Sequence, residues 1–354
     1  GQSVFLSNGE TWKRQRRLID PAFEGGRIKD TFPAMHAAGL SLLSRLDAGD
    51  HEVEELASYA AADVIFRTLF SIPIENEMAR DVFHEFRRYQ RAQPILNIGA
   101  FIPLPKWMPR FHKKETKASA ARIRALISDM TQQRAVALES GSAPDDLASK
   151  IMTAVDPVTG DTFQWQEMVD QVAIFFLAGH ETSASALSWS LYLMALYPEW
   201  QDKVASEAAV INDKNDFSVM SKLRVSRDVF RETLRLYPPV PMMVRTSHKT
   251  EVFRGRTVKK GAQIVLSPWH LHRHERLWDN PDGFDPNRWQ SENGRQCMRD
   301  AFIPFSEGAR VCPGAGFAMI EGPLLLSMIL SKYRVSFASQ ARPVPVAHLT
   351  VRAE

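Results

Sequence analysis

The feature that most constrains the fold is the stretch FSEGARVCPG at 305–314, which precedes a long apolar helical run. It contains Cys312, one of only two cysteines in the chain. Gly308 permits a turn with positive φ, in which the backbone can lie close to a flat ligand, and Arg310 places a permanent cation two residues before the thiol. Pro313 suits a first helical position, so Cys312 is expected at or beside the N-cap. Free N–H groups there favour a thiolate, which is a good soft ligand for iron.

The helical pattern at 165–196 is the longest in the chain. It is apolar nearly all round, which predicts a helix through the core. Its middle, AGHET at 178–182, places polar residues where a core helix favours leucine. Buried polar groups are unfavourable unless they are paired, so this interruption is either a packed polar kink or a functional site. A zinc site of the H-E-x-x-H type is excluded because position 184 is alanine.

Two further pairs of residues have helical spacing. Trp12 and Arg16 lie four residues apart on a basic helix expected at 9–23, so they share a face. The alternative is a solvated helix with one half-buried tryptophan. Glu232 and Arg235 lie three apart on a later helix and also share a face. The alternative for them is an ordinary surface ion pair, which contributes little to stability.

Five motifs occur in a fixed order: W-x-x-x-R, A-G-x-E-T, E-x-x-R, the FDPNRW loop at 284–289, and the cysteine stretch F-x-x-G-x-R-x-C-x-G. Together they resemble the cytochrome P-450 family, the haem-thiolate monooxygenases, along the whole chain. The resemblance implies the cytochrome P-450 fold, which is mainly α: a single haem domain over 1–354, helical with a minor β-sheet region. It also implies haem b (iron protoporphyrin IX) as the cofactor, with the Cys312 thiolate as the metal ligand.

The resemblance carries specific roles for residues near the haem. The cofactor-binding residues that it implies are Trp12, Arg16, Ala178, Gly179, Arg245, Phe305, Gly308, Arg310, Cys312 and Gly314. Gly179 is expected to leave room for dioxygen, the Thr182 hydroxyl to hydrogen-bond dioxygen and water, and Glu181 to relay protons. An acid–alcohol pair suits a reaction in which two protons are needed to release water. His180 is expected in a supporting or solvent-facing position rather than as an iron ligand.

The resemblance also assigns a structural network and a substrate pocket. Glu232 and Arg235 are expected to form an internal ion-pair network with Arg288 of the FDPNRW loop, although Asn287 stands where the family often has glutamate. Breaking a buried pair of this kind typically costs roughly 3–5 kcal/mol. The proline-rich segment that follows predicts extended backbone past the haem. Its pocket candidates are Val240, Met242, Met243 and Val244.

The implied reaction inserts one oxygen atom from O₂ into an apolar organic substrate and releases the other atom as water. Electrons are expected from NAD(P)H through a separate partner of the ferredoxin or flavodoxin/flavin reductase type, because no flavin- or nicotinamide-binding glycine motif is visible. Lys13, Arg14 and Arg17 are expected to steer an acidic donor. The alternatives are a peroxide-driven peroxygenase and a non-catalytic haem-binding sensor.

Composition limits the remaining possibilities. A net charge of +3 gives no indication of a nucleic-acid partner, and two cysteines exclude a disulfide framework or a four-cysteine iron–sulfur cluster within this chain. They fit a reducing, cytoplasmic location. No apolar run approaches the ~18 residues of a membrane span. Family members carry helices and strands before the basic helix, so the chain is expected to be truncated at its N-terminus; an anchor upstream of residue 1 stays open.

Other segments give coarser expectations. Helices are expected within 27–70 and at 113–140, a β-hairpin at 251–267, and strands at 333–339 and 344–354. Apolar side chains between 95 and 107 are expected either in the roof of the substrate pocket or in plain packing. His270, His272 and His274 alternate, so on a strand they would share a face, as in some metal sites; the family has a structural His/Arg-rich segment at this place.

Overall fold

The computed structural model describes residues 2–91, 114–211, 216–347 and 350–353. The segment 95–107, expected as the roof of the substrate pocket, lies outside these residues. The described α-helices are α1 Gly9–Ile19, α2 Gly25–Arg45, α3 Val53–Phe70, α4 Glu77–Arg91, α5 Lys114–Glu139, α6 Leu147–Met152, α7 Trp165–Leu196, α8 Pro198–Ala208, α9 Arg224–Leu236, α10 Pro268–Leu271, α11 Glu292–Asp300 and α12 Ala315–Leu330. Short 3₁₀ segments are η1 Asp20–Phe23, η3 Phe217–Ser221, η4 Pro286–Gln290 and η5 Gly308–Arg310.

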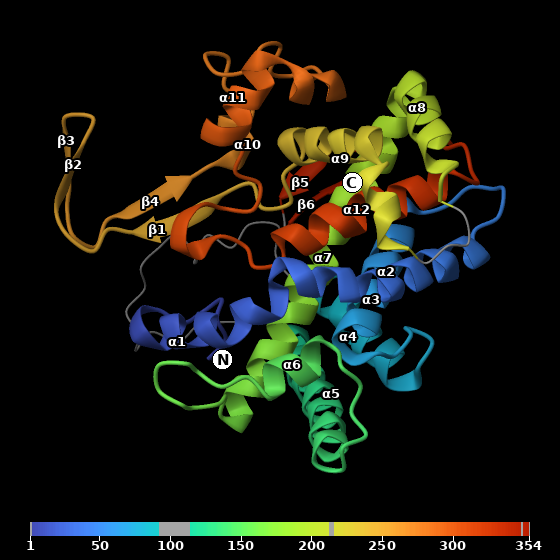
Figure 1. The fold of residues 1–354 in the computed structure, drawn as a ribbon. Helices are drawn as coiled ribbons and strands as arrows, with labels where there is room; N and C mark the ends of the chain where they lie inside the picture. Colours follow the sequence, from blue (N-terminus) through green and yellow to red (C-terminus); the bar gives the residue numbers. More distant parts are fainter. Residues whose placement is uncertain (1, 92–113, 212–215, 348–349, 354) are drawn as a thin grey trace.

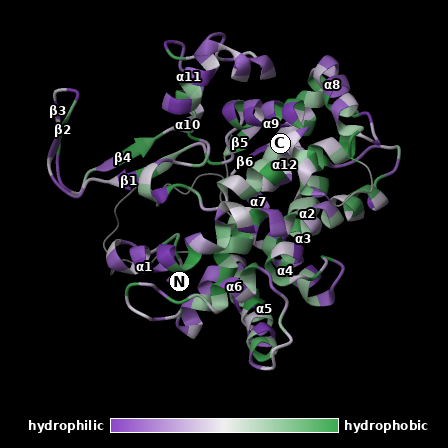
Figure 2. Cartoon of the chain, viewed as in Figure 1, coloured by the Kyte–Doolittle hydropathy of each residue, from purple (hydrophilic) through white to green (hydrophobic). Residues whose placement is uncertain are grey.

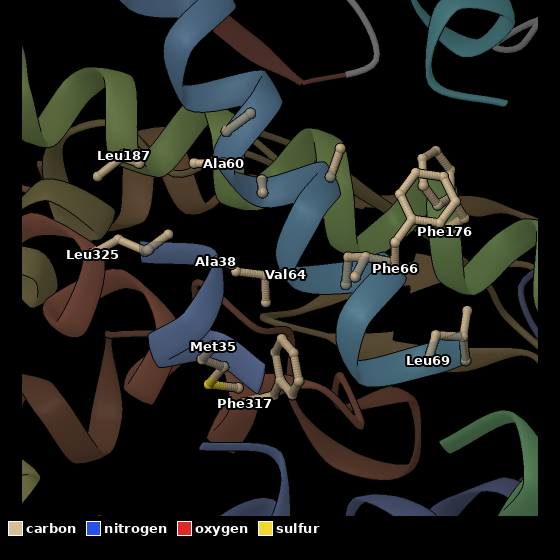
Figure 3. Close-up of a cluster of buried hydrophobic side chains, with 14 of the residues drawn as sticks. Met35, Ala38, Ala60, Val64, Phe66, Leu69, Phe176, Leu187, Phe317 and Leu325 are labelled. Carbon is tan, nitrogen blue, oxygen red and sulfur yellow. The ribbon is translucent and has the colours of Figure 1, made fainter. Parts of the chain in front are cut away.

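Helix α7 is the centre of the molecule and has the bounds that the sequence predicts (Figure 1). Its main partner is α3, whose run Ala60–Ala62 is fully buried and lets the two helices approach closely. Aromatic rings fill the contact: Phe66 of α3 and Phe176 of α7 lie 4.7 Å apart between ring centroids, side by side in Figure 3. The polar interruption of α7 is therefore set in a tightly packed core.

Helix α12 forms the second layer against α2, α7 and α9. It is apolar along most of its length, which Figure 2 shows as green and white ribbon, whereas α1 and α11 carry mainly hydrophilic residues. Gly39 of α2 makes the contact possible, because a Cβ there would lie 2.4 Å from the sulfur of Met328. Met35 of α2 and Leu325 of α12 are buried at the same interface (Figure 3).

The β-structure is minor, as predicted. The described strands pair as three antiparallel two-stranded sheets: β1 Met243–Thr246 with β4 Gln263–Leu266, β2 Glu251–Phe253 with β3 Arg256–Val258, and β5 Pro345–Ala347 with β6 Val351–Ala353. The hairpin β2–β3 projects from the body of the molecule (Figure 1). Its turn forms where the sequence predicts, with positive φ at Arg254 (50°) and Gly255 (75°).

One prediction about local structure is wrong, and one alternative is excluded. Residues 333–339 form no strand, because the backbone N–H and C=O of Val335 bond to the Gln201 side chain at the end of α8 instead of to a neighbouring strand. The three histidines do not alternate along a strand either, since His270 lies in α10 and the chain turns directly after it. His272 is buried, whereas His270 and His274 are exposed, and the described residues contain no His/Cys/Asp/Glu cluster that could hold a metal.

Candidate active site

The cysteine loop is a tight turn that the backbone closes on itself. The N–H of Cys312 donates to the carbonyl of Phe305 (2.9 Å), and the N–H of Val311 donates to the carbonyl of Gly308 (3.0 Å). Gly308 has φ +69°, as its predicted turn requires. Helix α12 begins at Ala315 with Gly314 as the N-cap, so Cys312 lies just ahead of the helix rather than at its cap.

The thiol of Cys312 is presented by this loop. The residue is exposed on one side and surrounded by protein on the others. The surrounding protein raises the pKa of the thiol, while the N–H of Gly314 and the charge of Arg16 act in the opposite direction. Whether the helix end favours the thiolate stays a prediction.

Three arginines from separate parts of the chain meet around the loop. Arg16 of α1 donates to the carbonyl of Val311 (2.8 Å) and pairs with Asp20. The guanidinium of Arg310 lies 4.3 Å from the ring centre of Trp12. The side chains of Arg16 and Arg310 are half-buried. The W-x-x-x-R motif and the cysteine stretch, which lie near opposite ends of the sequence, therefore form one site.

The third arginine, Arg245 of β1, reaches the same loop and donates to the Ser306 hydroxyl (2.7 Å). Burial, followed by repulsion from Arg245 and Arg16, lowers the pKa of Arg310. Among the described residues, no carboxylate pairs with Arg245 or Arg310. Two half-buried arginines without a carboxylate partner are suited to an anionic ligand.

The polar interruption of α7 presents two different faces. Ala178 is exposed and Thr182 half-buried, and the Thr182 hydroxyl donates to the Ala178 carbonyl (2.6 Å). Glu181 instead points into the protein. Its oxygens accept hydrogen bonds from the side chains of Gln90 (3.0 Å) and Thr350 (3.1 Å).

Glu181 also pairs with Arg352 of β6 at 3.2 Å, with side chains only 4% and 14% exposed. Within the described residues, Glu181 and Thr182 share no hydrogen bond. The predicted acid–alcohol pair is adjacent in sequence but divided between two faces of α7, since neighbouring helical residues point about 100° apart. Their joint role in proton transfer stays a prediction.

The two residues before Glu181 are fixed by packing. A Cβ on Gly179 would lie 2.5 Å from Cδ1 of Ile65 on α3, so any larger residue there would crowd the contact between the two helices. His180 is not solvent-facing as one alternative held: it is 1% exposed, and its Nε2 lies 2.8 Å from the Ser58 hydroxyl. Burial, with help from Arg87 and Arg352, lowers its pKa to about 3, so the imidazole is neutral.

The predicted ion-pair network is formed. Glu232 and Arg235 pair at 2.8 Å with fully buried side chains, and Arg288 of η4 approaches Glu232 at 3.2 Å. Both arginines also donate to loop carbonyls, including Gly283 (2.8 and 3.2 Å). The guanidinium nitrogens of both arginines therefore have hydrogen-bond partners, which a buried charged network needs in order to be stable.

Sequence reasoning missed the part played by His272. Its Nδ1 lies 3.2 Å from the Arg235 carbonyl, and its Nε2 lies 2.9 Å from the N–H of Ile303, two residues before the cysteine loop. Only the neutral Nδ1–H tautomer satisfies both contacts, and burial lowers its pKa to about 3. His272 therefore links the ion-pair network to the cysteine loop. Nothing in the alternating histidines distinguished it from its neighbours.

The pocket candidates do not share one face. Met243 and Val244 are consecutive on β1 and point to opposite sides. Met243 lies on the face of Arg245, which reaches the cysteine loop, whereas Met242 and Val244 are exposed. Val240, before the strand, is half-buried. Of the four, Met243 is best placed toward the loop; the pocket itself stays a prediction.

The basic residues of α1 are largely neutralised. Arg14 pairs with Glu167 (2.5 Å), Arg17 with Asp156 (2.7 Å), and Lys13 with Glu10 (2.7 Å). The expectation that these three cations steer an acidic electron donor loses most of its physical basis, because each cation already has an acid partner.

Comparison with known proteins identifies the fold and the site. A family model described as Cytochrome P450 matches residues 1–352. The chain belongs to the cytochrome P450 family. It is 31% identical over 358 residues to cyclooctat-9-en-7-ol 5-monooxygenase of Streptomyces melanosporofaciens, covering 98% of this chain and 74% of that relative. It is 29% identical over 371 residues to a cytokinin hydroxylase of Arabidopsis thaliana, covering 99% and 70%.

The solved structures agree with this assignment. A cytochrome P450DA mutant heme domain superposes with a TM-score of 0.87 at 27% identity, covering 100% of this chain and 78% of that one. The predicted fold, family and enzyme class are therefore confirmed: the protein is a P450 monooxygenase. No helix in the described part of this P450 is long and apolar enough to span a membrane.

The family implies haem, and the residues present fit it. Cys312 offers a thiol on an exposed loop, and Arg245 and Arg310 offer cations that lack protein anions within the described chain. Haem b has two propionates, which match such a donor set in charge. Ala178 of α7 is exposed and small, so it leaves space on its side of the helix. Which residue binds which group stays a prediction.

Proposed function

We propose that this P450 inserts one oxygen atom from O₂ into an apolar organic substrate, using electrons that arrive singly from NAD(P)H through a separate redox partner. The proposal rests chiefly on the convergence of the Cys312 loop with Arg16, Arg245 and Arg310. Haem bound there would supply oxygen activation, and a thiolate ligand favours O–O cleavage. The partner would be of the ferredoxin or flavodoxin/flavin reductase type.

The chain's own residues would have three tasks. Cys312 would bind iron through its sulfur, and the two backbone bonds that close its loop would fix the direction of that sulfur. Arg16, Arg245 and Arg310 would orient the propionates. The Thr182 hydroxyl, which now donates to its own helix, would turn to hold water or dioxygen in the open space beside Ala178.

The substrate would be a small molecule with an apolar reacting end. Met243 on the Arg245 face of β1 would contact it. One relative is named as acting on cyclooctat-9-en-7-ol and another on cytokinins. Apolar contact alone does not select one substrate, because one methylene group changes the binding free energy by only about 1–3 kcal/mol.

The first test is the absorption spectrum of the reduced, haem-loaded protein with carbon monoxide. A strongly red-shifted Soret band is expected for wild type, because a thiolate donates electron density to iron. The Cys312→Ala variant should lose that band, whereas Cys297→Ala should retain it, since Cys297 is buried and bonds to the Leu277 carbonyl. A red-shifted band in Cys312→Ala would contradict the ligand assignment.

The source of electrons is tested with the same preparation. Product should form with NAD(P)H, a reductase and a ferredoxin or flavodoxin, and should be absent without the carrier. Full activity with hydrogen peroxide alone would favour a peroxygenase instead. Haem binding with no substrate-induced change of iron spin state and no product would favour a sensor.

The role of Thr182 is tested by coupling. In Thr182→Ala we expect NAD(P)H to be consumed while peroxide is released, so that product per NAD(P)H falls by roughly tenfold or more. Thr182→Ser keeps the hydroxyl and is the matched control. Equal coupling in the alanine variant and wild type would refute the role.

A further inference from the structure

The imidazole of His272 lies between the ion-pair network and the backbone that leads into the cysteine loop. It is fully buried, and each ring nitrogen faces one backbone group: Nδ1 lies 3.2 Å from the Arg235 carbonyl oxygen, and Nε2 lies 2.9 Å from the Ile303 nitrogen. Burial lowers the pKa of this imidazole to about 3, so the neutral ring has one donor and one acceptor. Because a backbone N–H can only donate, Nε2 is the acceptor and Nδ1 carries the proton.

The network holds this ring from several directions. Arg235 accepts the proton of Nδ1 on its own carbonyl, which lies in the last turn of α9 and so lacks a partner within the helix. Its guanidinium donates to the His272 carbonyl (2.9 Å) and pairs with Glu232. The ring also lies against Phe302, with 5.3 Å between ring centroids. The position of Nε2 is therefore determined by α9 and its ion pair.

On the loop side, Ile303 is the first residue of a β-turn whose second residue is proline, a favoured residue at that position. Its carbonyl accepts from the N–H of Ser306 (3.2 Å), and the next carbonyl but one, that of Phe305, accepts from the N–H of Cys312 (2.9 Å). Within the described chain, no side chain other than His272 hydrogen-bonds to the backbone of residues 302–305. The contact with His272 therefore lies directly beside the bond that closes the cysteine loop.

We propose that His272 is a positioning residue for the iron ligand: its acceptor nitrogen holds the backbone before the cysteine loop and so keeps the sulfur of Cys312 directed at the haem iron. The inference rests on the proposed function, because it takes Cys312 as the ligand. His272 acts through the backbone of Ile303 and Phe305 and not on the sulfur itself. The buried ion pair then supports the site as well as the fold, since it fixes the ring that fixes the loop.

The alternative is that the ring only fills space beside Phe302, and the two explanations differ in one atom, the acceptor. Glutamine and asparagine separate them because both are neutral amides. In His272→Gln the amide oxygen reaches the place of Nε2 and can accept from Ile303. In His272→Asn the shorter side chain places its amide near the place of Nδ1, where it can donate to Arg235 but cannot reach Ile303.

The test follows the red-shifted Soret band of the reduced, haem-loaded protein with carbon monoxide over time, without substrate or an electron-donor protein. In His272→Asn we expect the band to be lost faster than in wild type by roughly fivefold, the factor that one net hydrogen bond represents. His272→Gln should lose the band at nearly the wild-type rate, because it keeps the acceptor. Equal rates in the two variants would overturn the proposal, since the acceptor would then be irrelevant.

A general loss of stability is controlled by Gln201→Leu. Gln201 of α8 is buried, and its amide bonds to backbone groups of Met194 and Val335, so this variant should also lower the denaturant midpoint. Its band should be lost at the wild-type rate, because none of these bonds reaches the cysteine loop. If Gln201→Leu loses the band as fast as His272→Asn does, the effect is one of overall stability and the proposal is overturned.

Variants that bind no haem also give a decision. If His272→Asn retains none, His272→Ser carries the comparison, since its hydroxyl is also too short to reach Ile303. Should both lack haem while His272→Gln retains it with the red-shifted band, the acceptor is what the site needs. If His272→Gln lacks haem as well, the whole ring is required and the proposal is overturned.

The hydrogen bond itself is tested in wild type, independently of the proposed function. NMR of protein labelled at the histidine nitrogens should show one imidazole with a protonated Nδ1 and a bare Nε2, whose signals are absent from His272→Gln. A His272 ring protonated at Nε2 would overturn the inference. A wild-type protein without the red-shifted band would instead contradict Cys312 as the ligand, and hence the proposed function, whatever the tautomer of His272.

Discussion

At the scale of single residues, Glu321 of α12 is a carboxyl enclosed by the protein. It is 1% exposed, and Oε2 accepts from the Ser183 hydroxyl (2.6 Å) while Oε1 has no partner among the described residues. Burial raises the pKa of this carboxyl to about 8. Glu321 is therefore neutral at pH 7 and joins the helix that follows Cys312 to the residue after Thr182.

A neutral buried carboxyl predicts a pH dependence of stability. Between pH 4.5 and 8 the folded protein holds a proton that the unfolded chain releases, so stability should fall by roughly 1.4 kcal/mol per pH unit from this group. Glu321→Gln keeps the shape and the contact with Ser183 but cannot ionise. Denaturant midpoints should show the variant losing less stability than wild type from pH 6 to 8.

Parallel pH profiles for Glu321→Gln and wild type would contradict the neutral carboxyl. Glu10→Gln is a suitable control because that carboxyl is highly exposed in its pair with Lys13. Such surface pairs change stability little, so this control should follow wild type over the same pH range.

At the scale of elements, the contact of α7 with α3 offers a different reason for Gly179 than oxygen access. Gly179→Ala should destabilise the protein by about 1–3 kcal/mol, because the new Cβ would crowd Cδ1 of Ile65. Adding Ile65→Val removes that carbon and should recover most of the loss. Denaturant unfolding of the four proteins in the cycle measures this coupling.

The double variant also separates packing from chemistry. If Gly179→Ala disturbs the haem spectrum and Ile65→Val restores it, helix packing explains the glycine. If stability recovers while the spectrum stays disturbed, the glycine is needed on the haem side as well. No rescue of stability would mean that the crowding lies elsewhere.

The same helix shows what the sequence could predict. The bounds of α7 follow from its apolar pattern, and the structure reproduces them. The apolar pattern does not show which way each side chain of AGHET points, because that depends on where α3, α4 and β6 pack around the helix. Glu181 was thus expected beside Thr182 but pairs with Arg352, whose position 171 residues later no local pattern reveals.

At the scale of the whole molecule, the sequence predicted the family and the ion-pair network because its motifs are short and local. Glu232 and Arg235 need only helical spacing to meet. The connection from that network to the cysteine loop passes through His272, whose burial is a property of the assembled fold. The strand expected at 333–339 does not form for a similar reason: the Gln201 side chain takes the backbone hydrogen bonds of Val335 that a neighbouring strand would otherwise make.

Three buried groups together predict the stability profile of the protein. His180 and His272 have pKa values of about 3 against an ordinary value of 6.5, so the unfolded chain binds more protons in that range and stability falls as the pH drops below 6.5. Glu321 has the opposite effect, because it lowers the stability of the folded protein as the pH rises from 4.5 to 8. From pH 4.5 to 6.5 the two histidines outweigh the one carboxyl, and above 6.5 only the carboxyl remains.

The contribution of these groups should therefore be greatest near pH 6.5, and the denaturant midpoint of the haem-loaded protein should fall on both sides of it. Replacing His272 with asparagine should lower the midpoint at pH 7, because the link to Ile303 weakens, and should also flatten the acid limb, because one titrating group is gone. Glu321→Gln should flatten only the alkaline limb. Two results would show that these imidazoles are not buried in the neutral form: a midpoint that rises steadily from pH 4 to 9, or an acid limb that stays equally steep in His272→Asn. Either result would mean that His272 does not connect the ion-pair network to the cysteine loop in the way the structure has it.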